Sequence, residues 1–144
     1  MEGYTIKIVG KTEEEILQIE ALRKQVFHIK ASAPNRYAKQ IRDEKIIPFA
    51  LFKGEDLIGG CYVGEGYDSL YIYYLFVRED FQKTGLRLGR GLLQEVLDHK
   101  ADIEALFDNH FERSALHPIS EEVKKIYQKI GYQEAPRGMM IRTI

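Results

Sequence analysis

The chain has 144 residues, a length that suits a single domain, and its 21 lysines and arginines against 22 aspartates and glutamates leave a formal net charge of -1. This balance argues against a broad cationic surface for nucleic acid or an anionic membrane. Cys61 is the only cysteine, which excludes an internal disulfide, and no apolar stretch approaches the ~20 residues that span a bilayer. Because residues 1–12 show no cleavable signal, we expect one cytoplasmic domain over residues 1–144.

The N-terminal part of the chain predicts a strand, a helix and a loop. Residues 4–9 alternate and are rich in β-branched side chains, which favours a strand. Thr12 suits the cap of a helix that runs to Phe27, with glutamates in its first turn and apolar side chains at helical spacing. Residues 31–47 are polar and lack a clean period, which predicts a loop with one short helix at residues 37–43.

The middle of the chain predicts the centre of a sheet. Residues 49–52 and 57–64 flank a turn and indicate a hairpin. After a second turn, residues 69–77 form a nearly continuous apolar run, as expected for a strand covered on both faces. Residues 85–100 have helical spacing. Two glycines inside that helix, each costing about 1 kcal/mol relative to alanine, indicate close approach of the backbone to a ligand or to the sheet.

The C-terminal part predicts more helices and strands, so the whole order is typical of a mixed α+β fold. Residues 102–110 either extend the preceding helix or form another one. Ser120 suits the cap of a helix over residues 121–130, and Gly131 suits its end. Short strands are predicted at residues 111–116, 132–135 and 139–144.

Two motifs resemble the GNAT superfamily of acyl-CoA-dependent N-acyltransferases, and the resemblance spans most of the chain. In that family a turn of pattern Gln/Arg-x-x-Gly-x-Gly/Ala follows the central strand, and residues 82–87 occupy its place with Arg87 at the last position. Counting back from the family's leucine pair, here Leu92 and Leu93, puts the second glycine at Gly89 instead. The two halves of this motif therefore disagree by two residues. The family's Tyr-x-x-x-Gly-Phe/Tyr motif is the more specific match, with Tyr127 in its first position.

The resemblance implies a fold and a way of binding acetyl-CoA. The fold is α+β, with a mixed, mostly antiparallel central sheet of six to seven strands flanked by helices. In the family, the pantetheine arm pairs with the main chain of the central strand, and the diphosphate meets unpaired N–H groups where the next helix begins. A backbone N–H of the strand also polarises the thioester carbonyl. The matching positions for acetyl-CoA here are Leu75, Phe76, Val77, Gln82, Lys83, Thr84, Gly85, Leu86, Arg87, Gly89 and Arg90.

Tyr127 is the residue for which the resemblance implies a catalytic role. In the family this tyrosine lies beside the sulfur and protonates the leaving thiolate. A thiol pKa of about 8.5 already makes the thiolate a tolerable leaving group, so general acid help is worth about 10²-fold or more and loss of Tyr127 should slow turnover without abolishing it. The competing interpretation is structural, because Tyr127 lies on the apolar stripe of its helix, where a tyrosine is usually a core residue.

The sequence leaves the general base and the acceptor open. The family often carries an acid on the central strand, where this chain has tyrosines, so Glu65, Asp68 or a bound water stay as alternatives. We expect an N-acetyltransferase that modifies a primary amine of a small molecule or a peptide, with no nucleic acid, membrane or metal as partner, and a homodimer is left open. A metal site is disfavoured because the four histidines show no suitable pairing and Cys61 has no second thiol beside it. A nucleophilic role for Cys61 is disfavoured because it lies in the alternating run of residues 57–64, where a small buried residue is the more common explanation. The alternative function is a non-catalytic module of the same fold that binds acyl-CoA as a sensor or assembles with a partner.

Overall fold

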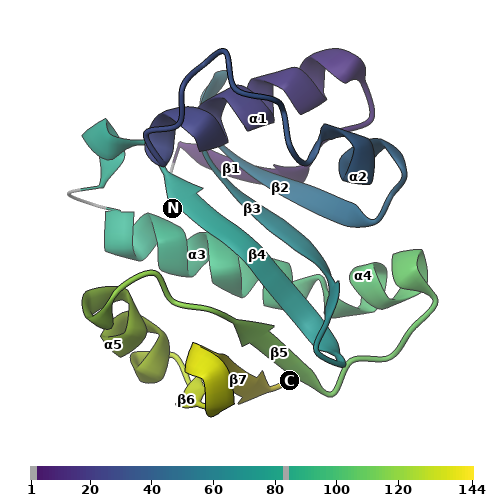
Figure 1. Cartoon of the computed structure of the whole chain (residues 1–144), viewed down its shortest axis with the longest axis vertical. Coiled ribbons are helices and arrows are strands. Elements are labelled where there is room, and N and C mark those ends of the chain that lie inside the picture. Colours follow the sequence, from purple (N-terminus) through teal and green to yellow (C-terminus); the bar gives the residue numbers. More distant parts are fainter. Residues whose placement is uncertain (1–2, 83–84) are drawn as a thin grey trace.

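The computed structural model describes residues 3–82 and 85–144, and these form one seven-stranded sheet in the order β1-β2-β3-β4-β5-β7-β6 (Figure 1). Neighbouring strands pair antiparallel except β4 and β5, which pair parallel. This confirms the predicted mixed, mostly antiparallel sheet. The strands are β1 (Tyr4–Ile8), β2 (Ile46–Lys53), β3 (Asp56–Gly66), β4 (Ser69–Val77), β5 (Arg113–Leu116), β6 (Gln133–Glu134) and β7 (Met140–Thr143).

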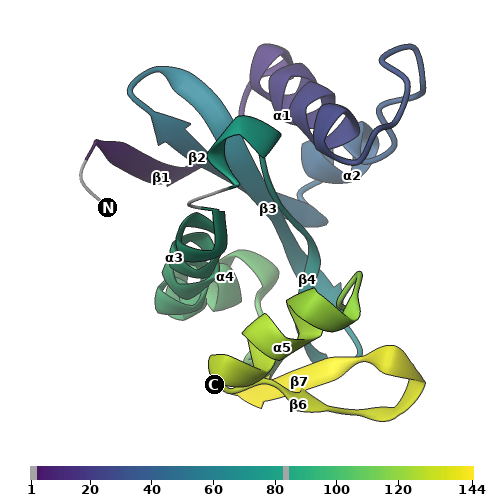
Figure 2. The ribbon, with the colours of Figure 1, turned by 90° about the vertical axis from the view of Figure 1, so that its left-hand side faces the viewer.

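Helices cover both faces of the sheet, with α1 and α2 on one face and α3 and α4 on the other (Figure 2). Side chains of the central strands alternate between the two faces, as strand geometry requires. In β2, for example, Ala50 packs toward α1, while Phe49 and Leu51 join the core under α3. The helices are α1 (Glu13–Val26), α2 (Ala38–Arg42), α3 (Gly85–Asp98), α4 (Lys100–Phe107) and α5 (Glu121–Lys129), with short 3-10 turns at η1 (Glu79–Phe81) and η2 (Pro136–Gly138).

The start of β2 differs from the prediction, which placed residues 46–48 in or next to a loop. The strand begins at Ile46 and contains Pro48. Proline cannot donate to a ladder, but β1 has ended by this point, and the single bond made there runs from the Val9 N–H to the Pro48 carbonyl at 3.0 Å. The missing N–H of Pro48 therefore costs little.

The segment that the sequence left undecided, residues 102–110, forms most of a separate helix. Helix α3 ends at Asp98, and His99 turns the chain with φ −93° and ψ 17° before α4 begins. The end of α4 is marked by Asp108, which has a left-handed conformation with φ 50°. None of the helices in the described residues is long and apolar enough to cross a membrane.

Candidate active site

Strands β4 and β5 run side by side at their starts and then diverge (Figure 1). Their parallel pairing covers only residues 70–72 of β4. At the same point the register between β3 and β4 shifts, so that Tyr74 opposes Tyr62 while Ile72 opposes Val63, and Tyr73 is the extra residue of a bulge. From Tyr73 onward, β4 keeps β3 on one edge and leaves its other edge without a neighbouring strand among the described residues. That edge offers main-chain N–H and C=O groups to a ligand.

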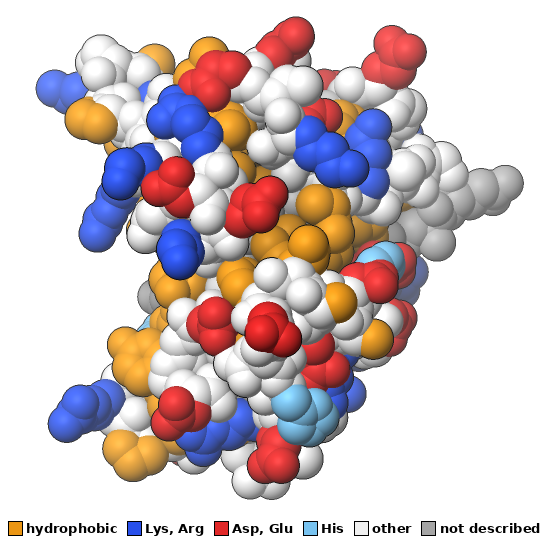
Figure 3. Space-filling model, turned by 90° about the vertical axis from the view of Figure 1, so that its right-hand side faces the viewer, with side chains coloured by type: hydrophobic (Ala, Val, Ile, Leu, Met, Phe, Trp, Pro, Cys, Tyr) orange, Lys and Arg blue, Asp and Glu red, His pale blue; other side chains and the backbone are white. Residues whose placement is uncertain are grey.

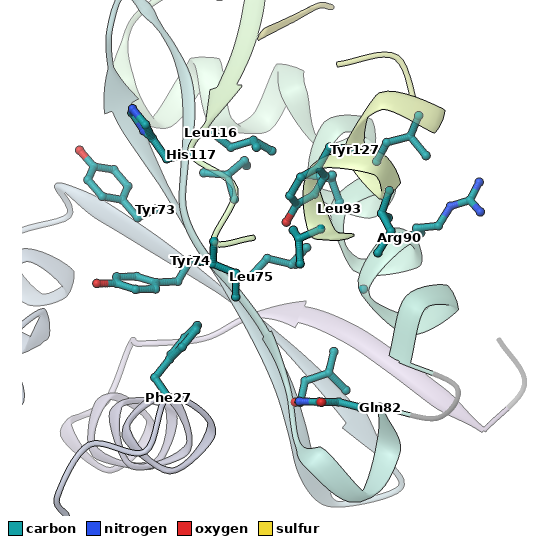
Figure 4. A pocket seen from close by; sticks show the side chains of 17 residues that line it. Phe27, Tyr73, Tyr74, Leu75, Gln82, Arg90, Leu93, Leu116, His117 and Tyr127 are labelled. Carbon is teal, nitrogen blue, oxygen red and sulfur yellow. The ribbon is translucent and has the colours of Figure 1, made fainter. Parts of the chain in front are cut away.

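A cavity of about 320 Å³ fills the space between the diverging strands, and it is bordered by α3, α5 and the segment after β5. Its wall is mostly apolar, with polar groups at few positions, which is the usual character of a small-molecule site. Figure 4 shows its principal side chains. The lining comprises Phe27, Ile72, Tyr73, Tyr74, Leu75, Val77, Gln82, Gly89, Arg90, Leu93, Leu116, His117, Ile119, Val123, Ile126, Tyr127 and Ile130.

Tyr127 lies in the cavity wall and not in a closed core. Its side chain comes from α5, which begins after Ser120, whose hydroxyl accepts a hydrogen bond from the Val123 N–H at 3.2 Å. The Tyr127 ring packs against Tyr132 with centroids 5.8 Å apart, and the residue is 8% exposed. Its hydroxyl points into the cavity (Figure 4) and has no hydrogen-bond partner among the residues at positions 3–82 and 85–144. No fully buried side-chain polar atom of these residues lacks a partner, so this hydroxyl is open to the cavity.

The surroundings of Tyr127 keep its phenol protonated. Burial, with smaller contributions from Cys61 and Tyr132, raises the pKa of Tyr127 well above its ordinary value of 10.0. The neighbouring Tyr132 is different, because its hydroxyl is paired with the Ser114 hydroxyl at 2.9 Å. The Tyr127 phenol therefore stays protonated throughout the neutral range, and its hydroxyl is directed into the cavity.

The positions expected to pair with pantetheine lie on the open edge of β4. The side chains of Leu75 and Val77 line the cavity, whereas Phe76 points to the opposite face and packs against Phe27 and Tyr62 at 6.1 and 5.8 Å between ring centroids. This alternation is that of any strand, so only the main chain of Phe76 can serve a ligand in the cavity.

The positions expected to hold the diphosphate lie where α3 begins. Gln82 lines the cavity and donates from its amide to the Val77 carbonyl at 2.8 Å. Lys83 and Thr84 lie outside the described residues, and for Gly85 and Leu86 only the main chain at the start of α3 is described. The main-chain N–H groups of the first turn of this helix have no intrahelical partners, which suits an anion.

Farther along α3, the two possible ends of the glycine motif, Arg87 and Gly89, have different positions relative to the cavity. Gly89 and Arg90 line the cavity, whereas the exposed side chain of Arg87 does not. A Cβ built on Gly89 would lie 3.9 Å from Leu75 Cδ2, an ordinary contact distance. Packing against the sheet therefore does not require glycine at position 89, and the space beside it is open to a ligand.

Glu65 and Asp68, the carboxylates considered as bases, are not in the lining of the cavity. Glu65 is engaged elsewhere, since its Oε2 accepts a hydrogen bond from Asn109 Nδ2 at 2.7 Å. Sequence reasoning missed His117, which does line the cavity and is hydrogen-bonded through Nδ1 to the Tyr71 hydroxyl. The available signal was its position directly after β5, at the place where the chain leaves the sheet beside β4.

A buried polar network holds the side of the cavity that faces α1. Glu20 is fully buried and accepts hydrogen bonds from Arg23 Nε at 2.7 Å and from the Tyr62 hydroxyl at 2.6 Å. It also accepts from the Tyr37 N–H at 2.9 Å, and the Tyr37 hydroxyl pairs with that of Tyr74 at 2.9 Å. Burial acts to raise the pKa of Glu20, but the hydrogen bonds from Arg23, Tyr62 and Tyr37 together lower it. The network thereby ties α1 and the loop before α2 to β4.

A second hollow, of about 610 Å³, lies between α2, the start of β2 and α4, where hydrophobic side chains gather at the surface (Figure 3). Its lining includes Ile41, Pro48 and Leu106, with the Glu13–Arg42 ion pair at its rim. It contains neither histidine nor tyrosine. Among the described residues no group of three or more histidine, cysteine, aspartate or glutamate side chains could hold a metal ion.

Comparison with known proteins agrees with this architecture. The family model for an acetyltransferase (GNAT) domain matches residues 10–138. The chain belongs to the GNAT acetyltransferase family. No curated protein has a significant match to the sequence.

Solved structures share the GNAT fold at low sequence identity. The ribosomal-protein-S18-alanine N-acetyltransferase of Escherichia coli is 16% identical, with a TM-score of 0.70 over 98% of this chain and 94% of that one. An aminoglycoside 6'-acetyltransferase type Ii is 14% identical, with a TM-score of 0.71 over 96% of both chains. A variant of the toxin AtaT, bound to acetyl-CoA and to the C-terminus of the antitoxin AtaR, is 11% identical, with a TM-score of 0.64 over 99% and 94%. These likenesses show the fold alone, and the acceptors named for the first two differ.

Proposed function

We propose that this GNAT domain transfers the acetyl group of acetyl-CoA to a primary amine, with Tyr127 as the general acid. The observation that carries the proposal is the Tyr127 hydroxyl, which is directed into the cavity opposite the open edge of β4 and has no hydrogen-bond partner among the described residues. A tyrosine that only packs in the core would have its hydroxyl paired and closed off, as Tyr132 has with Ser114, whereas the Tyr127 hydroxyl is open to the cavity.

In the proposed complex, acetyl-CoA lies along the open edge of β4. The pantetheine amides pair with the main chain of residues 73–77, as an added strand would. The start of α3 receives the diphosphate, and Arg90 adds positive charge near it. A main-chain N–H of the same strand edge donates to the thioester oxygen and stabilises its negative charge in the tetrahedral intermediate.

The chemical step is a direct attack. The neutral amine nitrogen forms a bond to the thioester carbon, the carbon–sulfur bond breaks, and the thiolate takes the proton of Tyr127. The amide nitrogen then returns a proton to the Tyr127 oxygen, so the phenol is restored. The acceptor enters on the side of the cavity formed by Phe27, Tyr73 and Tyr74, away from Gln82 and Arg90 (Figure 4).

The test is a panel of amines with acetyl-CoA, read out as free thiol release, for the unaltered chain and for Tyr127→Phe. We expect turnover with at least one amine, and a fall in kcat of about 10²-fold for Tyr127→Phe with little change in the affinity for acetyl-CoA. Tyr132→Phe is the matched control, because it removes a neighbouring buried hydroxyl that is not in the cavity lining, and it should keep kcat.

Two results would contradict the proposal. Equal kcat values for the unaltered chain and Tyr127→Phe would rule out Tyr127 as the general acid. If acetyl-CoA raises the melting temperature but no amine is acetylated, the domain is a non-catalytic acyl-CoA sensor, which is the function favoured by the lack of any carboxylate in the cavity lining of the described residues.

A further inference from the structure

A cluster of aromatic side chains lies at the acceptor end of the cavity, and two of its members, Tyr73 and His117, line the cavity. The cluster consists of Tyr67, Tyr71, Tyr73 and His117. The His117 ring lies 5.5 Å from the ring of Tyr67 and 5.7 Å from that of Tyr71, and the rings of Tyr71 and Tyr73 are 4.8 Å apart. Figure 4 shows His117 and Tyr73 at the opposite end of the cavity from Gln82 and Arg90. His117 is therefore on the acceptor side and not on the side expected for the diphosphate.

The ring of His117 is held in a defined orientation, although its side chain is exposed. Its Nδ1 is hydrogen-bonded to the hydroxyl of Tyr71, which comes from the paired part of β4 and is 9% exposed. Burial raises the pKa of Tyr71 to about 12, so this partner is a neutral phenol over the whole neutral range. A bond at Nδ1 fixes the ring plane and leaves Nε2 as the second reactive atom.

Few other groups in the cavity can accept a proton. The polar side chains of the lining are those of Tyr73, Tyr74, Gln82, Arg90, His117 and Tyr127. An amide and a guanidinium cannot act as bases near neutral pH, and a neutral phenol is a poor base. The titratable side chains in contact with the imidazole ring are Tyr67 and Tyr71, and the nearby cation Arg113 is engaged with the Tyr67 carbonyl at 3.1 Å. No carboxylate contacts the ring among the described residues.

We propose that His117 is the general base of the transfer and that Tyr71 is its positioning residue. This inference rests on the proposed acetyltransferase function. Nδ1–H donates to the Tyr71 oxygen, and the Nε2 lone pair takes one proton from the acceptor ammonium group. The resulting neutral amine attacks the thioester carbon, and the imidazolium then releases its proton to water. For an amine with a lysine-like pKa of about 10.4, forming the neutral amine at pH 7 costs roughly 4 to 5 kcal/mol, and the proton transfer to His117 lowers this cost at the site.

The experiment measures kcat/KM against pH for His117→Gln, with an acceptor identified in the amine panel. Glutamine keeps a polar side chain of similar reach but cannot take a proton at neutral pH. We expect kcat/KM at pH 7 to fall by about 10²-fold and the acidic limb of the profile, which a general base of the free enzyme produces, to disappear. Tyr71→Phe should give a smaller loss in kcat/KM and keep an acidic limb, because His117 can still accept a proton.

His110→Gln is the matched control, since His110 is exposed, is paired with Glu104 and is not in the cavity lining. It should leave the profile unchanged, and the rise in melting temperature with acetyl-CoA should be equal in all variants. If His117→Gln keeps more than half of kcat/KM, or keeps the acidic limb at the same pH, the base is not His117 while the acetyltransferase function stands. If the unaltered chain acetylates no amine, the proposed function fails and the inference fails with it.

Discussion

Gly89→Ala separates the two reasons why a glycine could be present inside α3. A glycine inside a helix costs about 1 kcal/mol of stability relative to alanine. The structure shows no steric need for glycine at position 89, because an added Cβ would make an ordinary 3.9 Å contact with Leu75. Without ligand, Gly89→Ala should therefore stabilise the domain by about 1 kcal/mol, which for a chain of this size raises the melting temperature by about 4 °C.

Gly89→Ala should weaken the binding of acetyl-CoA, although it stabilises the free domain. Gly89 lines the cavity beside Leu75 and Arg90, so a methyl group there occupies space that the ligand needs. We expect the dissociation constant for acetyl-CoA to rise at least tenfold, which corresponds to about 1.4 kcal/mol. Thermal melts of the free and acetyl-CoA-bound variant, with calorimetric titration, measure both effects.

Gly91→Ala is the matched control, because Gly91 lies in the same helix but is not in the cavity lining. It should bind acetyl-CoA as tightly as the unaltered chain. If Gly89→Ala binds acetyl-CoA as tightly as the unaltered chain, position 89 does not border the ligand; if the variant melts at a lower temperature without ligand, glycine is needed there for packing.

Two further predictions concern buried groups near the cavity. Glu20→Gln leaves the buried Arg23 without its carboxylate, so urea denaturation should show a loss of about 3–5 kcal/mol in the free energy of unfolding. Because the pKa of Glu20 is lowered in the folded state, the stability that Glu20 contributes is present above its ordinary pKa of 4.5 and is lost as the pH falls through the folded pKa. Glu20→Gln should therefore lose less stability than the unaltered chain as the pH falls below 4.5. An unchanged acid profile would contradict this assignment. Cys61 is fully buried and its pKa is raised by burial, so a maleimide should not label the native chain and Cys61→Ala should keep turnover; rapid labelling with loss of activity would show the opposite.

The sequence was sufficient for the sheet and most helices because local patterns specify them. Apolar runs and alternation predicted the strands from residues 57–64 and 69–77, and the caps at Thr12 and Ser120 are those of α1 and α5 in the structure. The start of β2 was predicted wrongly because proline ordinarily marks a loop. Pro48 is acceptable in this strand because β1 has already ended beside it.

The cavity itself depended on features that the sequence does not display. The divergence of β4 from β5 and the bulge at Tyr73 arise from strand pairing, so no local pattern announces them. The family motif singled out Tyr127, which the structure places in the cavity lining. The contact between Tyr71 and His117 joins residues 46 positions apart, so no local sequence pattern indicates it. For the same reason the sequence does not distinguish the buried carboxylate Glu20 from the other glutamates of its helix, because its partners Tyr37 and Tyr62 come from distant segments.

The most direct test of the proposed binding mode is a structure of the domain bound to acetyl-CoA. We expect pantetheine to pair with the open edge of β4 at residues 73–77, the diphosphate to lie at the start of α3, and the sulfur to lie within hydrogen-bonding distance of the Tyr127 hydroxyl. Acetyl-CoA bound at any other surface, or bound with its sulfur remote from Tyr127, would contradict it.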